Sequence, residues 1–219
     1  FSAIQELKDE QTAITFHFYP TVWEADLCDI DYPRQRRREI FEDRFYKMLS
    51  NMQKFRRPLL CGEAGYDIAG HQLWHVMEMV EDTLELFEKY QVSWTLWSYK
   101  DACFMGIVYP KKESAWMEFA REIHRQWTHY KEMEMGKALV EQMCQYFPGE
   151  VSEKLKYELQ FRQRALLFTL QKEQILKPQL LRWGWKKIRQ MPASFRMENC
   201  GYYKEYEELL AKFTMDKYS

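Results

Sequence analysis

The chain has 219 residues, a hydrophobic fraction of 46% and a net charge of −1. This length allows one sizeable core or two small ones. The balanced charge gives the chain as a whole no attraction to nucleic acid or to an anionic membrane, and no apolar run approaches the roughly 18 residues of a membrane span. We therefore expect neither partner. The five cysteines are scattered and contain no CxxC pair, which favours a reducing compartment over a disulfide framework.

Three short apolar runs in the first hundred residues predict buried strands, at 13–18, 58–62 and 92–97. Between and after them, apolar residues at helical spacing predict helices over 34–55, 73–87 and 116–127. A repeated strand-then-helix order predicts parallel strands joined by right-handed crossovers, and hence an α/β fold.

The first of these helices begins with a basic run, Arg34, Arg36, Arg37 and Arg38. Such a run can mark a nucleic-acid site. Acidic residues follow within one helical turn, so we favour a solvated helix face instead.

From about residue 130 the strand signals stop. Helical patterns cover 131–147, 150–176, 178–190 and 203–214, separated by proline and glycine. The stretch Trp183-Gly184-Trp185-Lys186-Lys187 suits either an interfacial membrane anchor or amphipathic packing, and we favour packing. This change of pattern predicts two parts, residues 1–127 and a helical extension over 128–219.

Groups capable of chemistry follow two of the predicted strands. Glu63 ends the second strand, between Gly62 and Gly65, which leave open space around its carboxylate. His17 and Tyr19 end the first strand, two residues apart and therefore on one face. A phenol beside a carboxylate holds it ionised and oriented, as a nucleophilic carboxylate requires.

Other site classes fit the sequence less well. His71 and His75 have the spacing of a zinc-binding helix, but Gln72 stands where a metalloprotease has its general base, and no third ligand is evident. The chain has no G-x-S-x-G hydrolase elbow and no glycine-rich phosphate loop. No metal or organic cofactor is implied.

The three strand ends resemble those of glycoside hydrolase family 5, the cellulase family of (β/α)8 retaining glycosidases. The resemblance covers roughly residues 13–127 and rests on three elements, His17-Phe18-Tyr19, Gly62-Glu63 and the run from Trp97 to Asp101. It implies strands six to eight of a TIM barrel. It also implies Glu63 as nucleophile, with His17 and Tyr19 lining the catalytic subsite.

The same resemblance implies that Trp97 forms the floor under the reacting sugar. We further assign Trp23 and Lys100 to binding of an oligo- or polysaccharide of the β-glucan type. The second carboxylate of this family, in an Asn-Glu pair, is missing: Asn51 and Asn199 precede Met and Cys. A barrel needs roughly 250 residues and eight strands. We therefore expect this chain to be the C-terminal part of a glycosidase, to need the N-terminal half of its barrel, and to be inactive alone.

Two other functions remain open. One is a non-catalytic carbohydrate-binding protein that keeps the aromatic rim, and the other is a protein-interaction module formed by the helical extension.

Overall fold

The computed structural model describes residues 6–21, 25–68, 71–100, 105–127 and 132–214. The chain divides into two compact units, one formed by Phe1–Tyr109 with Tyr202–Ser219 and the other by Pro110–Gly201. No helix within these described ranges is both long enough and apolar enough to cross a membrane.

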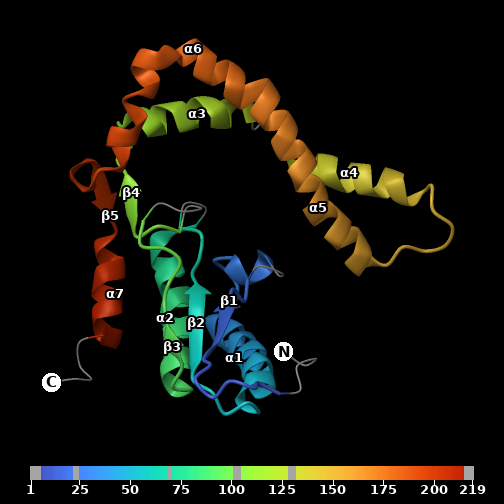
Figure 1. The fold of residues 1–219 in the computed structure, drawn as a ribbon, viewed down its shortest axis with the longest axis vertical. Coiled ribbons are helices and arrows are strands. Elements are labelled where there is room, and N and C mark those ends of the chain that lie inside the picture. The colour runs from blue at the N-terminus through green and yellow to red at the C-terminus, as the bar shows by residue number, and fades with distance from the viewer. Residues whose placement is uncertain (1–5, 22–24, 69–70, 101–104, 128–131, 215–219) are drawn as a thin grey trace. The chain divides into compact units, whose positions relative to one another are not determined.

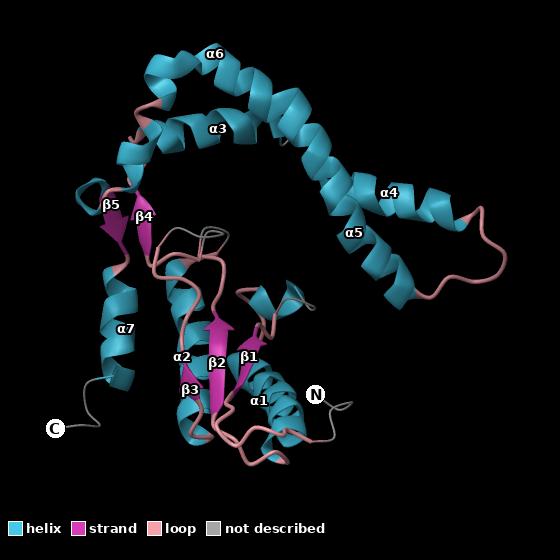
Figure 2. Ribbon diagram, in the orientation of Figure 1, coloured by secondary structure: helices cyan, strands magenta, loops and turns pink. Residues whose placement is uncertain are grey.

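The first unit is built on a parallel sheet, as the sequence predicts (Figures 1 and 2). Its strands are β1 (Ile14–Phe18), β2 (Leu59–Ala64) and β3 (Ser93–Trp94), in the order β1-β2-β3. β3 is shorter than the predicted strand 92–97. The fold is therefore α/β, and the described strands form an open sheet and no closed barrel.

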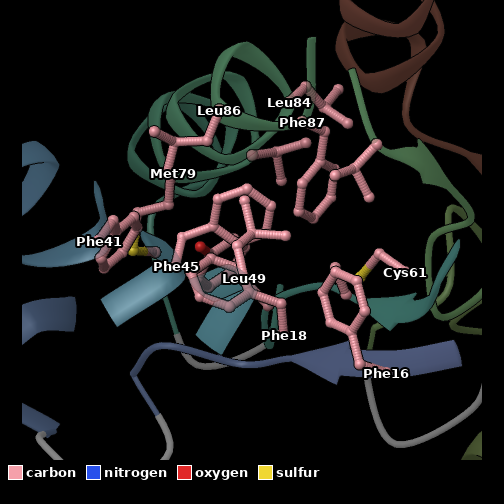
Figure 3. Packing of buried hydrophobic residues seen from close by; sticks show 14 of the residues in the cluster. Phe16, Phe18, Phe41, Phe45, Leu49, Cys61, Met79, Leu84, Leu86 and Phe87 are labelled. Atoms are coloured by element: carbon pink, nitrogen blue, oxygen red, sulfur yellow. The ribbon is translucent and has the colours of Figure 1, made fainter. Parts of the chain in front are cut away.

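Three helices accompany this sheet in the first unit: α1 (Arg34–Gln53), α2 (Leu73–Lys89) and α7 (Lys204–Thr214). A short 3-10 turn covers Ala25–Cys28. The core lies between the sheet and helices α1 and α2 (Figure 3). There Phe18 of β1 meets Phe45 of α1, with ring centroids 5.0 Å apart, and Phe45 meets Phe87 of α2 at 5.4 Å.

Alternation along β1 places Ile14, Phe16 and Phe18 in this core, whereas Thr15 and His17 are exposed. The alternation in the sequence predicts that Phe16 or Leu60 faces the interior of a barrel and is exposed in this chain. Leu60 is 37% exposed. The prediction is wrong for Phe16, which is buried and packs toward α1, with its ring centroid 6.1 Å from that of Phe45.

The helix that follows β3 within the first unit is α7, whereas the sequence predicts the helix 116–127 in that place. α7 packs against α2 and contributes the buried Tyr206 and Leu209 to the core. Helix α3 (Ala115–Trp127) belongs to the second unit. The division of the chain thus does not coincide with the expected boundary at residue 127, because the second unit is inserted between β3 and α7.

The second unit is helical. It contains α3, α4 (Glu132–Cys144), α5 (Glu153–Gln171), a π-helical turn (Lys172–Leu176), α6 (Lys177–Ile188) and 3-10 turns at Met191–Phe195 and Met197–Asn199. Strands β4 (Val108–Pro110) and β5 (Cys200–Tyr202) pair where the chain enters and leaves the unit. The expectation that no strand follows residue 130 is therefore wrong at β5.

The basic run of α1 does not form the solvated face that its sequence predicts. Arg37 is fully buried, and Arg34 and Arg38 donate hydrogen bonds to Oδ1 of the buried Asp82 on α2. Only Arg36 makes the expected pair with Glu39, at 3.0 Å. Arg34, Arg37 and Arg38 thus form an inter-helix ion-pair cluster, because their acidic partners lie on α2.

His75 borders this cluster and is predicted to make stability depend on pH. Its Nε2 donates to the Cys28 carbonyl oxygen at 3.1 Å, and its Nδ1 has no hydrogen-bond partner among the described residues. Burial lowers the pKa of His75, and the Arg37 guanidinium lowers it further. The unfolded chain therefore takes up this proton first, and stability should be lost as pH falls below about 6.5. The unfolding free energy from urea titrations should decrease between about pH 7.5 and about pH 5.5. His75→Gln should decrease it less, and an unchanged pH dependence in that variant would contradict this role.

Candidate active site

The backbone of β2 turns Glu63 toward the open face of the sheet. β1 pairs with β2 in register up to Phe16 and Cys61, and then His17 pairs with Glu63, so that Gly62 is the extra residue of a bulge. The bulge brings Glu63 onto the side of the exposed His17. Glycine suits the bulge position, because a Cβ there would lie 2.8 Å from Oγ1 of Thr15.

Two side chains from the end of β1 meet the Glu63 carboxylate. Tyr19 Oη donates a hydrogen bond to Glu63 Oε2 at 3.0 Å, and His17 Nδ1 lies 3.3 Å from the same oxygen. The Glu63 side chain is 28% exposed and that of His17 is 54% exposed. The structure thus brings together the three residues to which the sequence analysis assigns catalysis, on a carboxylate that solvent can reach.

The segment after β3 continues alongside β2 and carries Trp97 to the same end of the sheet. Thr95 N donates to the Cys61 carbonyl oxygen at 2.9 Å, and Trp97 N donates to that of Ala64 at 2.8 Å. The Trp97–Ser98 peptide bond is cis. The Trp97 side chain is 39% exposed, as a ring that stacks on a ligand requires.

Gly65 allows this close approach, because a Cβ at that position would lie 2.3 Å from the Trp97 carbonyl oxygen. The pair Gly62 and Gly65 therefore shapes the backbone on both sides of Glu63 and does more than leave open space around the carboxylate.

The structure gives less on the other two predicted binding residues. Lys100 forms a backbone bridge with Val108, and Trp23 lies outside the described residues. Their assignment to substrate binding stays a prediction.

The sequence analysis missed Thr95, whose hydroxyl donates to the Gly62 carbonyl oxygen at 2.7 Å. Thr95 alternates with Ser93 and Trp97 along an exposed edge. The sequence carries this alternation, but an apolar run such as 92–97 predicts a buried strand and not an edge with exposed side chains.

The two histidines with the spacing of a zinc-binding helix lie in different environments, because His71 precedes α2 and His75 lies on it. His71 is exposed and His75 is buried with Nε2 bonded to Cys28. No group of three or more His, Cys, Asp or Glu side chains that could hold a metal ion occurs among the residues that the structure describes.

Comparisons with known proteins add no further evidence. No protein-family model, curated protein or solved structure matches the chain.

Proposed function

We propose that this chain is part of a retaining glycoside hydrolase that cleaves O-glycosidic bonds in β-glucan-type oligo- or polysaccharides, with Glu63 as the nucleophile. The observation that carries the proposal is the contact of Glu63 Oε2 with Tyr19 Oη at 3.0 Å and His17 Nδ1 at 3.3 Å. The Tyr19 hydroxyl and the His17 ring hold the carboxylate in one orientation, and an oriented carboxylate oxygen is what attack on an anomeric carbon requires.

The proposed mechanism is a double displacement. A Glu63 oxygen forms a bond to the anomeric carbon while the bond to the leaving oxygen breaks, and water then hydrolyses the glycosyl-enzyme. The acid that protonates the leaving oxygen belongs to protein outside these 219 residues. In a retaining pair it lies about 5–5.5 Å from Glu63, and this chain alone should be inactive toward substrates with poor leaving groups.

The proposal also assigns the sheet to the last three strands of a (β/α)8 barrel. Two features support this assignment. β1 and β3 are both edge strands among the described residues, and the sheet face that bears Thr15, His17 and Leu60 is exposed. An uncovered face and two unpaired edges are unfavourable unless further strands cover them.

Covalent trapping tests the nucleophile assignment. The protein from the complete reading frame is incubated with 2,4-dinitrophenyl 2-deoxy-2-fluoro-β-cellobioside, whose leaving group needs no acid and whose fluorine slows hydrolysis of the glycosyl-enzyme. Mass spectrometry should show one added fluorocellobiosyl group, located on the peptide that contains Glu63. The Glu63→Gln variant should not be labelled. A label on a different carboxylate would contradict the assignment.

Trp97 should contribute to binding through stacking of its indole on a pyranose ring. Trp97→Ala should weaken binding of cellotetraose by about tenfold, measured by isothermal titration calorimetry on the same full-length protein. Trp116 in the second unit provides the matched control, since it is 37% exposed against 39% for Trp97, and Trp116→Ala should leave the affinity unchanged. Equal affinities of wild type and Trp97→Ala would contradict the stacking role.

A further inference from the structure

The second unit carries a concentration of positive charge that the net charge of the chain conceals. Residues 159–196 contain nine Lys or Arg residues and one acidic residue, Glu173, although the whole chain has a net charge of −1. The basic residues are Arg162, Arg164, Lys172, Lys177, Arg182, Lys186, Lys187, Arg189 and Arg196. This stretch comprises most of α5, the π-helical turn, α6 and the 3-10 turn Met191–Phe195, and α5 runs on through the π-helical turn into α6 in Figure 1. We call residues 159–196 the basic helix.

The basic helix also exposes large apolar side chains. Those with more than half of their surface accessible are Phe161, Leu166, Phe168 and Leu170 on α5, and Leu181 and Trp185 on α6. Successive residues of a helix are rotated by about 100°, so Phe161 and Phe168 lie on roughly the opposite side of α5 from Leu166 and Leu170. On α6, the exposed Leu181 and Trp185 stand beside Arg182, Lys186 and Lys187.

Packing within the second unit fixes which side of α6 is turned outward. Trp183 Nε1 donates to Glu122 Oε2 of α3 at 2.7 Å, and Gln179 donates to the same oxygen. Leu181 lies two positions from both residues, a rotation of about 200° on a helix, and is 83% exposed. In the Trp183–Lys187 stretch, for which the sequence predicts packing, Trp183 thus packs against α3.

The other tryptophan of the stretch, Trp185, is exposed to solvent. Gly184 lies between the two tryptophans, and its backbone is non-helical, with φ +69° and ψ 164°, so that α6 is interrupted there. Trp185 is 71% exposed and is followed by the exposed Lys186 and Lys187.

We propose that the basic helix binds the surface of anionic phospholipid membranes, with the exposed Leu181 and Trp185 of α6 entering the headgroup region. Lysine and arginine beside exposed leucine, phenylalanine and tryptophan are the combination that interfacial helices use, since the charges attract anionic headgroups and the apolar groups insert. A second copy of this chain would bring two positive surfaces together. Nucleic acid would use the charges and aromatic rings but would leave the exposed leucines in water.

Vesicle flotation tests this proposal on the full chain. Floated protein is bound to vesicles, whereas self-associated protein stays at the bottom of the gradient. The chain should float with phosphatidylcholine vesicles that contain about one third phosphatidylserine, should not float with phosphatidylcholine alone, and should bind less at high salt. Lys186→Glu should lower the partition coefficient by about tenfold or more, and the double change Leu181→Ser with Trp185→Ser should lower it similarly.

Matched controls come from the first unit. Lys8→Glu makes the same change of charge at an exposed lysine, and Trp74→Ser removes an exposed tryptophan from α2. Neither should alter flotation. The proposal is wrong if the chain fails to float, if it binds both vesicle types equally, or if the controls lower binding as much as the variants of the basic helix. Tight binding of a single-stranded oligonucleotide without flotation would favour nucleic acid instead.

Discussion

Glu63→Gln is expected to lower kcat/KM for aryl β-cellobiosides by at least about 10⁴-fold in the protein from the complete reading frame. The amide keeps the shape of the side chain and its contact with Tyr19, but it cannot form the covalent bond to the anomeric carbon. The thermal midpoint should barely change, since the Glu63 side chain is 28% exposed and fills no core position.

Glu63→Asp is the matched comparison, because it keeps the charge but withdraws the carboxylate by one methylene. Its kcat/KM should lie below that of the wild type but above that of Glu63→Gln. A Glu63→Gln variant within tenfold of wild type would remove Glu63 from the reaction.

Asp82→Asn should destabilise the first unit by about 3–5 kcal/mol. The side chain of Asp82 is 1% exposed, and its Oδ1 accepts from Arg34 Nη2 at 2.7 Å and from Arg38 Nη1 at 3.2 Å. The fully buried Arg37 also lies close, with Nη2 3.7 Å from Asp82 Oδ2. Removal of the negative charge leaves these guanidinium groups without their central partner. The unfolding free energy from urea titrations at neutral pH is the measurement.

Asp43→Asn is the control for this loss. Asp43 forms an exposed pair with Lys47 on α1 at 2.6 Å, and exposed pairs contribute less than about 1 kcal/mol. A destabilisation by Asp82→Asn as small as that of Asp43→Asn would show that the buried cluster does not hold α1 and α2 together.

The sequence was sufficient to predict the three-residue cluster at Glu63. Residues at the C-terminal ends of neighbouring parallel strands lie at one edge of a sheet, and apolar runs ending in His17, Tyr19 and Glu63 identify those ends without knowledge of the register. The parallel order of the three strands and the helices α1 and α2 follow from the same strand–helix alternation.

Other features depend on contacts between distant segments. The burial of Arg37 could not be predicted from α1, because its partners Glu78 and Asp82 lie on α2. Likewise, the pairing of α7 with α2 joins segments separated by the whole inserted unit, so local periodicity assigned α3 to the sheet instead. Alternation places Phe16 and His17 on opposite faces of β1 without telling which face the helices cover, so the packing of Phe16 toward α1 could not be predicted.

Azide rescue of a Glu63→Gly variant tests most directly whether Glu63 is the nucleophile, because the anomeric configuration of the glycosyl azide shows which carboxylate was replaced. In Glu63→Gly, azide can take the place of the missing carboxylate and attack the anomeric carbon of 2,4-dinitrophenyl β-cellobioside from the side opposite the leaving group. One carbon–nitrogen bond forms as the bond to dinitrophenolate breaks, which inverts the anomeric centre. Proton NMR should therefore identify α-cellobiosyl azide, formed by the variant and not by the wild type. Formation of the β-azide would mean that a different carboxylate still acts as nucleophile, and would contradict the assignment of Glu63.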